Sequence, residues 1–314
     1  MTVIIEAKEL YKQYPSQKEN HPALDGIDLA VNSGQLYGLV GPDGAGKTTL
    51  LRILATVMEP TSGAVRLDGF DVRKQAEAIR ARLGYMPQAF SLYPDLSVME
   101  NLKFFADING VPGNKQKKRI EELLEFARLT DFTNRRSENL SGGMRKKLAL
   151  ACALIHEPKI LLLDEPTTGV DPVSRRELWH LLAKVIQQDV TVLVSTPYMD
   201  EAERCNTVSI INEGRMLITG APTALEAQMP FRIVEVKARP RRALREAVDH
   251  TEGVLSWRAV GDRLRLSVEN PTDAIPRIDD NLKKAGAEIS ILREARLLME
   301  DVFIYLVEKQ KEQA

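Results

Sequence analysis

The sequence predicts an α/β protein in which a large core domain, built on a mainly parallel sheet, is followed by a smaller α+β domain. Two short apolar runs, residues 160–163 and 190–194, are typical of strands in a parallel sheet that is covered on both faces. A helical pattern separates them, and a glycine-rich turn at residues 41–48 joins another strand pattern to another helix pattern. From residue 231 onward, short strands and helices follow one another in a different order.

The core domain can be justified element by element. Ser97 and Glu100 form a capping-box pattern, which is typical of a helix start. Apolar residues follow with helical period, so we expect a mainly helical insertion in the α/β core. The expected elements are strand-like pieces over 2–31 with a polar loop at 15–22, a strand over 35–40, a helix from 49, a strand over 64–69, helices over 97–158, a strand over 160–163, a helix over 174–188 and a strand over 190–194.

The second domain shows the order strand, helix, strand, strand, helix, strand, which is the ferredoxin-like arrangement. These elements are expected at 231–238, 241–250, 254–260, 263–269, 272–285 and 287–293, with a last helix from Leu297 to about Gln310. Residues 221–230 are expected to form a linker. The predicted domains are therefore residues 1–225, with a helical subdomain at about 90–157, and residues 226–314.

Composition narrows the function classes. The 314 residues are 44% hydrophobic and 28% charged, which is ordinary for a globular protein. The formal net charge of −1 gives no electrostatic argument for nucleic acid as a partner. Cys152 and Cys205 lack the spacing of metal ligands, so we expect core residues in a reducing compartment. No signal peptide and no apolar run of about 20 residues is seen. We therefore expect a cytoplasmic chain whose membrane role comes through a partner.

Residues 41–48 form a complete phosphate-binding loop, matching G-x-x-x-x-G-K-[ST] between a strand and a helix. Gly41, Gly44 and Gly46 let the backbone wrap an anion so that its N–H groups point inward, and the helix dipole adds to that field. Lys47 is expected to reach the β- and γ-phosphates of ATP, and the Thr48 hydroxyl to ligate Mg²⁺.

Two further segments carry chemistry. Asp164 and Glu165 follow the apolar run at 160–163, so Asp164 is expected to hold Mg²⁺ or its waters and Glu165 to polarise the attacking water as general base. Residues 140–144 place glycines before a helix and make a second anion site without a lysine. A second site of this kind suggests that it serves a nucleotide held by another subunit.

Together with Gln88, Asp171 and Tyr14, these motifs resemble those of the nucleotide-binding subunit of an ATP-binding cassette (ABC) transporter, over about residues 3–225. The resemblance implies a P-loop NTPase (RecA-like) core with an antiparallel β subdomain and a helical subdomain. It also implies integral membrane permease subunits as partners, a second cassette in a homo- or heterodimer that closes head to tail, and a peripheral position on the inner face of the membrane. The resemblance further implies that Tyr14 stacks on the adenine ring of ATP, with Tyr11 as the alternative residue for this role.

The resemblance assigns roles residue by residue. Nucleotide-contacting residues are implied to be Tyr14, Gly41, Pro42, Asp43, Gly44, Ala45, Gly46, Lys47, Thr48, Thr49, Ser141, Gly142, Gly143 and Asp171. The implied Mg²⁺ residues are Thr48, Gln88 and Asp164, and the implied catalytic residues are Glu165, Lys47 and Gln88.

One position departs from the family pattern. The family has Ser-Thr-His after the last apolar strand, and by resemblance this histidine contacts the γ-phosphate, whereas this chain has Ser195, Thr196 and Pro197. Proline offers neither a side-chain donor nor a backbone N–H. Two interpretations follow: the chain's own hydrolytic site is weakened, or neighbouring groups compensate. In an asymmetric dimer, the intact segment 140–144 could complete a competent site on a different cassette.

Other features place the chain within the family. The loop variant with Pro42 and Asp43, Met144, and the tail at 299–303 resemble the drug- or multidrug-exporter branch. The resemblance implies that the tail regulates or stabilises the closed pair; a packing appendage is the alternative. Residues 89–93 are expected to receive a helix of the membrane subunit.

Two other functions remain open from the sequence. A soluble cassette protein acting on ribosomes or DNA usually carries two cassettes or a long coiled-coil insertion, and neither is seen here. A regulatory subunit that binds nucleotide with negligible turnover is the other. The transported substrate cannot be read from this sequence, because its pocket belongs to other polypeptides.

Overall fold

The computed structural model describes residues 2–15, 22–89 and 91–312. The chain divides into two units, Met1–Pro222 and Thr223–Ala314, and the boundary expected from the sequence is after residue 225. Each unit is described by itself. Within the described part of the chain, every helix is too short or too polar to cross a bilayer.

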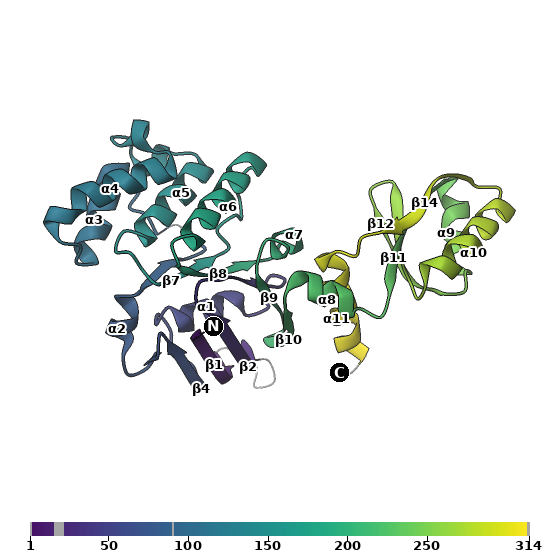
Figure 1. Ribbon diagram of the computed structural model, residues 1–314, viewed down its shortest axis with the longest axis horizontal. Coiled ribbons are helices and arrows are strands. Elements are labelled where there is room, and N and C mark those ends of the chain that lie inside the picture. Colours follow the sequence, from purple (N-terminus) through teal and green to yellow (C-terminus); the bar gives the residue numbers. More distant parts are fainter. Residues whose placement is uncertain (1, 16–21, 90, 313–314) are drawn as a thin grey trace. The chain divides into compact units, whose positions relative to one another are not determined.

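A six-stranded sheet forms the centre of the first unit, in the order β10-β9-β3-β8-β7-β6 (Figure 1). All neighbouring strands are parallel except β10 against β9. Every residue of β3, β7 and β8 is buried, as expected for apolar runs in a sheet covered on both faces. The bounds are β3 (Leu36–Val40), β6 (Leu83–Met86), β7 (Ile160–Asp164), β8 (Thr191–Thr196), β9 (Thr207–Asn212) and β10 (Arg215–Gly220).

A second, antiparallel sheet of four strands has the order β2-β1-β4-β5 and confirms the expected β subdomain. Its strands are β1 (Val3–Lys12), β2 (Leu24–Asn32), β4 (Ser62–Leu67) and β5 (Phe70–Asp71). Helix α1 (Lys47–Leu54) shares one hydrophobic core with both sheets, since Leu50 and Leu51 belong to the same buried cluster as Ile5 and Leu162. This core fixes the start of α1 relative to the end of β3.

The remaining helices of this unit include the expected helical insertion. Ser97 accepts from the Glu100 N–H while the Glu100 side chain accepts from the Ser97 N–H, so the predicted capping box is confirmed. The helices are α2 (Ala76–Arg80), α3 (Val98–Ile108), α4 (Gly113–Ala127), α5 (Gly142–Ala153), α6 (Pro172–Ile186) and α7 (Met199–Ala202), with 3₁₀ turns η1 (Thr130–Phe132) and η2 (Ser137–Asn139). Cys152 and Cys205 are buried free thiols, as predicted.

The register of the parallel strands brings their carboxyl ends to one edge of the sheet. Val40 is opposite Thr196, Asp164 is opposite Ser195, and Met86 is opposite Leu163. Segments that leave β3, β6, β7 and β8 therefore start side by side, which is where open α/β sheets bind ligands.

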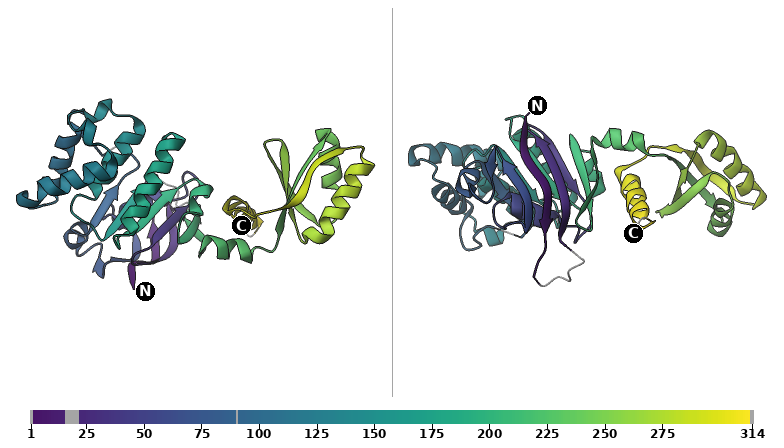
Figure 2. Two further views of the ribbon diagram at one scale, coloured as in Figure 1. Left: turned by 45° about the horizontal axis from the view of Figure 1, so that its top comes forward. Right: turned by 90° about the horizontal axis from the view of Figure 1, so that it is seen from below.

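The second unit has the predicted ferredoxin-like topology. Its antiparallel sheet has the order β12-β13-β11-β14, and α9 and α10 cover one face (Figure 2). The elements are β11 (Arg232–Arg239), α9 (Arg241–Asp249), β12 (Val254–Val260), β13 (Arg263–Val268), α10 (Pro271–Lys284), β14 (Glu288–Ala295) and α11 (Met299–Glu312).

The expected linker at 221–230 is wrong in one respect, because most of it is helix α8 (Pro222–Gln228). Leu225 and Met229 are buried, at 1% and 7% exposure. Leu225 lies in α8 and Met229 directly follows it. The two are four positions apart and bury one side of the segment, which favours a helix despite the prolines at its ends.

Candidate functional site

The loop after β3 brings its glycines into close contact with neighbouring backbone. A Cβ at Gly41 would lie 2.1 Å from the Ile211 carbonyl oxygen, and one at Gly46 would lie 2.5 Å from the Ala23 carbonyl oxygen. Gly46 also has φ 106° where it caps α1. Glycine is therefore required at both positions, and the loop leads directly into the N-terminus of α1. Asp43 is exposed at the loop tip.

Lys47 holds its ammonium group within this loop. The side chain is 3% exposed, and Nζ donates to the carbonyl oxygens of Gly41 at 2.8 Å and Pro42 at 2.9 Å. It also forms an ion pair with Glu165 Oε1 at 3.2 Å. A buried cation that is surrounded by oxygens can exchange some of them for phosphate oxygens.

Asp164 ends β7 beside the loop. Its Oδ1 accepts from the Ser195 hydroxyl at 2.7 Å and from the Thr48 hydroxyl at 3.1 Å. Burial raises the pKa of Asp164, and the hydrogen bonds from Ser195 and Thr48 oppose this only in part. Its Oδ2 is buried and has no hydrogen-bond partner.

This donor set fits Mg²⁺. A buried carboxylate oxygen without a partner, next to a threonine hydroxyl, offers the hard oxygen ligands that the ion prefers. Among the described residues, no group of three or more His, Cys, Asp or Glu side chains could hold a metal ion by itself. Thr48 and Asp164 would therefore hold Mg²⁺ together with ligands from a nucleotide and water.

Glu165 is held from several sides. Its φ is 48°, an uncommon conformation for a residue with a side chain, and its N–H donates to the Ser195 hydroxyl at 3.1 Å. Besides the contact of Oε1 with Lys47, Oε2 accepts from Gln88 Nε2 at 2.9 Å and from the Thr168 hydroxyl at 3.2 Å. The side chain is thus fixed next to both Gln88 and the loop lysine.

Sequence reasoning did not identify Ser195 and Thr168 as parts of this network. A signal for Ser195 exists in retrospect, because it stands at the end of the apolar run that pairs with β7. Thr168 belongs to the turn after Glu165, whose conformation no sequence pattern specified.

Tyr14 lies beside the loop helix. Its hydroxyl is 3.2 Å from the Thr49 hydroxyl and donates to Met58 Sδ at 3.3 Å. The Tyr11 hydroxyl instead donates to Gln13. Of the two tyrosines, Tyr14 is the one next to α1, while its role toward adenine stays a prediction.

The second predicted anion segment is built differently and lies elsewhere. Ser141 caps α5, and its hydroxyl accepts from the Met144 N–H at 3.2 Å. A Cβ at Gly143 would lie 2.3 Å from the Ser174 hydroxyl oxygen, so α5 begins directly against α6, which Asp171 caps. Across the described ranges, no hydrogen bond or ion pair joins Ser141, Gly142 or Gly143 to residues 41–49. In the described part of the chain, the two anion segments thus share no hydrogen bond or ion pair.

Pro197 follows the last residue of β8 and is half-buried. Three histidines fall in the described residues. His156 contacts the Leu83 carbonyl at the opposite end of β6, His180 is in α6, and His250 ends α9. His21 lies outside the described residues. No described histidine therefore takes the place of Pro197 beside the loop.

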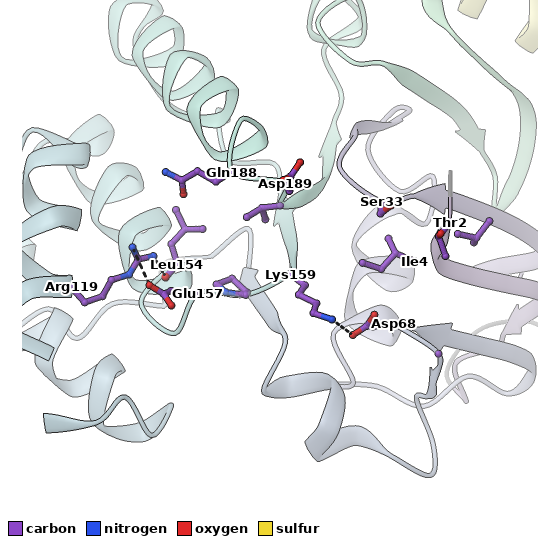
Figure 3. A pocket seen from close by; sticks show the side chains of 14 residues that line it. Thr2, Ile4, Ser33, Asp68, Arg119, Leu154, Glu157, Lys159, Gln188 and Asp189 are labelled. Carbon is purple, nitrogen blue, oxygen red and sulfur yellow. Dashed lines mark hydrogen bonds and ion pairs between the residues drawn. The ribbon is translucent and has the colours of Figure 1, made fainter. Parts of the chain in front are cut away.

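A separate cavity of about 870 Å³ lies where the parallel strands begin (Figure 3). Lys159 and Asp189, which precede β7 and β8, line it together with Asp68, and Lys159 pairs with Asp68 at 3.1 Å. None of the predicted site residues lines this cavity.

Comparison with known proteins places these features in context. Residues 24–168 match the family model described as ABC transporter, and this span contains the phosphate loop, Gln88, Ser141 and both acidic residues. The chain is 43% identical over 310 residues to the probable multidrug ABC transporter ATP-binding protein YbhF of Escherichia coli (strain K12), with 97% of this chain and 52% of that protein covered. The chain therefore spans about half the length of that relative.

Two further proteins are similar over more of their length. The chain is 36% identical over 312 residues to the Nod factor export ATP-binding protein I of Cupriavidus metallidurans, with 99% of each covered. A solved dimeric structure of the ATP-binding cassette MJ0796, in a post-hydrolysis state bound to ADP and Pi, is similar with a TM-score of 0.64 and 28% identity. That similarity covers 69% of this chain and 98% of the other.

Proposed function

Because this chain belongs to the ABC transporter family, we propose that it is the ATP-binding and ATP-hydrolysing subunit that powers an exporter. Support for export comes from the relatives, whose names include a multidrug transporter protein and a Nod factor export protein. The substrate would be chosen by membrane subunits, so this chain is assigned the energy-coupling role alone.

One observation carries the proposal: the carboxyl ends of β3, β7 and β8 bring Lys47, Asp164 and Glu165 together. Lys47 pairs with Glu165 at 3.2 Å, while Thr48 donates to Asp164 at 3.1 Å. A cation, a metal-binding pair and a fixed carboxylate next to an anion-binding loop are the parts that phosphoryl transfer to water requires.

The steps assigned to this chain follow from those contacts. Lys47 exchanges its bonds to Gly41, Pro42 and Glu165 for oxygens of the β- and γ-phosphates. Released from Lys47, Glu165 is free to accept a proton from the attacking water, while Gln88 and Thr168 keep its carboxylate oriented. When bound at Thr48 and Asp164, Mg²⁺ supplies positive charge that neutralises the phosphates.

We further assign the segment Ser141–Gly143 to the nucleotide of a second cassette. Among the described residues, this segment shares no hydrogen bond or ion pair with the chain's own loop, and the structure of MJ0796 is dimeric; both support the assignment. Asp171 caps the helix that packs against this segment, and we assign it the link between the two sites on that basis. Homodimer and heterodimer both satisfy this assignment. The cassette pair would lie in the cytoplasm on the inner face of the membrane, bound to permease subunits.

In this proposal, Pro197 in place of a histidine slows ATP hydrolysis at the chain's own site. The turn after β8 borders the phosphate loop, since the Gly41 N–H donates to the Thr196 carbonyl at 3.3 Å. A proline there donates no hydrogen bond to a terminal phosphate. ATP binding would then persist while turnover is slow, and a regulatory subunit with negligible turnover is the limiting case.

Residues 89–93 are the proposed contact with the membrane subunit. Tyr93 is 46% exposed, and its ring packs edge-on against Phe104 of α3, with centroids 4.5 Å apart. Phe90, the other aromatic residue expected there, lies outside the described residues. An exposed aromatic side chain on a firmly packed base is typical of an interface anchor.

The test is ATP binding and ATP hydrolysis by the purified chain and by its complex with co-purified membrane subunits. Glu165→Gln should keep ATP binding and lose about 100-fold or more in turnover. Lys47→Ala should weaken ATP binding about 10- to 100-fold. Glu269→Gln, which changes an exposed carboxylate of the second unit, is the matched control and should behave as wild type. Full turnover in Glu165→Gln would contradict the proposal, and co-purification with ribosomes or DNA would favour a soluble cassette protein instead.

A further inference from the structure

Glu201 is a fully buried carboxylate that the proposed mechanism does not use. It lies on α7 with 0% exposure, and three side chains donate to it. Arg175 Nε reaches Oε1 at 2.6 Å, Trp179 Nε1 reaches the same oxygen at 3.0 Å, and the Thr196 hydroxyl reaches Oε2 at 2.6 Å. Burying a carboxylate is costly unless donors surround it, so each of these contacts is held firmly in place.

Thr196 connects this carboxylate to the phosphate loop. Its hydroxyl donates to Glu201 and accepts from the Tyr198 N–H at 3.1 Å, while the Glu201 N–H donates to the Tyr198 carbonyl at 3.2 Å. Its carbonyl accepts from the Gly41 N–H. The turn at Pro197 and Tyr198 is therefore fixed at both ends, and one of these ends contacts the first glycine of the loop.

The other side of Glu201 is helix α6. Arg175 and Trp179 stand four positions apart on this helix, so both face Glu201 from successive turns. Arg175 also pairs with Asp200 at 2.9 Å, and its guanidinium lies 4.6 Å from the centre of the Tyr198 ring. The helix that carries them is the one that Asp171 caps.

We propose that Glu201 is a positioning residue, which holds the turn 196–198 against the terminal-phosphate side of the loop and ties that turn to helix α6. That side is where the proposed base Glu165 lies: the Ser195 hydroxyl accepts from the Glu165 N–H at 3.1 Å, and the neighbouring Thr196 carbonyl accepts from the Gly41 N–H. This inference rests on the proposed ATPase function. Because Pro197 has no donor of its own, a displaced turn would act by shifting Ser195 and with it Glu165, the proposed base at the third phosphate. ATP binding and turnover therefore depend on Glu201, while ADP binding does not.

The experiment compares threonines at the two ends of β8. Thr196→Val removes the hydroxyl without changing shape, and Thr196→Ser keeps it. Thr191→Val is the matched control, because Thr191 is equally buried at the start of the strand and its hydroxyl accepts from the Gly34 N–H at 2.9 Å. For each variant, and for Glu201→Gln, we measure kcat, the affinities for ATP and ADP, and the melting temperature.

Thr196→Val and Glu201→Gln should each lose about tenfold in kcat and in the ratio of ATP affinity to ADP affinity, with ADP affinity unchanged. Thr196→Ser should restore both quantities. Thr191→Val should lower the melting temperature and leave the ratio at the wild-type value.

The outcomes separate this inference from the proposed function. If Thr196→Val lowers ATP and ADP affinity in parallel, or matches Thr191→Val in every measurement, the positioning role is overturned while the ATPase assignment stands. If Glu165→Gln hydrolyses ATP as the wild type does, the proposed function itself fails. The nucleotide affinities of the Thr196 variants then still decide whether the turn senses the third phosphate.

Discussion

At the scale of single residues, the site depends on pairs that hold one another in place before any nucleotide arrives. Lys47 and Glu165 are both nearly buried, and each satisfies the other. Gln88 and Thr168 orient Glu165, and Ser195 orients Asp164. Such preorganisation means that binding of phosphate needs local exchange of partners rather than rebuilding of the site.

The departure at position 197 gives the first prediction. Pro197→His would place a donor at the turn next to Gly41, and we expect ATP turnover to rise about tenfold or more through stabilisation of charge on the terminal phosphate. Steady-state ATP hydrolysis by the same preparation measures it.

The combination Pro197→His with Glu165→Gln is the control and should stay inactive. If Pro197→His leaves turnover unchanged while Glu165→Gln abolishes it, neighbouring groups already compensate for the missing histidine, and the site is not weakened.

At the scale of elements, helix α6 has two tasks that can be separated. Asp171 caps the helix by accepting from the Val173 and Ser174 N–H groups, each at 3.0 Å, and it is also the proposed link to the second cassette. Asp171→Ala should cost about 1 kcal/mol of unfolding free energy, whereas Asp171→Asn should keep the cap. Chemical denaturation of the chain measures this difference.

The same two variants test the link between sites. If the charge of Asp171 matters beyond capping, both variants lose cooperativity of ATP hydrolysis in the assembled complex. If Asp171→Asn behaves as wild type in both stability and cooperativity, Asp171 acts as a helix cap alone.

The segment before α3 gives a further prediction at this scale. Tyr93→Ala should reduce transport by the complex while ATP affinity of the isolated chain is unchanged, because the ring packs on Phe104 of α3. Transport into vesicles, measured together with ATP binding, checks this. Leu255→Ala, which removes an exposed apolar side chain of the second unit, is the comparison variant. Unchanged transport in Tyr93→Ala would remove this segment as the docking site.

At the scale of the whole molecule, the second unit has its own pH dependence. Burial raises the pKa of Asp301, but hydrogen bonds from Arg265, from the Leu298 N–H and from Arg258 outweigh it and hold the pKa below its usual value. A lowered pKa means that the stabilisation is present above the unfolded-state pKa of about 3.9 and is lost as pH falls through the lower folded-state pKa. The second unit should therefore lose stability as the solution becomes more acidic than about pH 4.

Asp301→Asn tests this dependence. At neutral pH this substitution should lower the free energy of unfolding by on the order of 2 kcal/mol, because Arg258 and Arg265 lose a charged acceptor. It should also make the loss of stability at acidic pH less steep. Melting temperatures between pH 3 and pH 7 provide the measurement. Glu300→Gln, which removes the half-exposed partner of Arg258, is the control and should lose melting temperature at acidic pH as steeply as the wild type. If the melting temperature of Asp301→Asn falls just as steeply at acidic pH, other carboxylates cause the pH dependence.

The sequence predicted the parts of the molecule whose pattern is local or whose strands are fully buried. Residues 160–163 and 190–194 could be identified as core strands because burial on both faces demands apolar runs, and residues 41–48 because a phosphate loop needs glycine at fixed offsets. The ferredoxin-like order followed from the succession of elements. Helix α8 was missed because its apolar face becomes apparent only when Leu225 and Met229 are seen to be buried.

What the sequence did not provide is the pairing of residues far apart in the chain. Ser195 lies 31 positions from Asp164, and the two meet because β7 and β8 are neighbours in register. Glu201 and Thr196 are close in sequence, yet their importance depends on Arg175 and Trp179 arriving from α6. Such contacts follow from strand order, which local patterns leave open.

The central claim is that the carboxyl ends of β3, β7 and β8 hold the triphosphate of ATP. A crystal structure of the Glu165→Gln chain with ATP and Mg²⁺ tests it most directly. The account predicts that the Lys47 ammonium contacts phosphate oxygens in place of the Gly41 and Pro42 carbonyls, with the ion next to Thr48 and Asp164. A triphosphate bound elsewhere, with Lys47 still bonded to those two carbonyls, would contradict it.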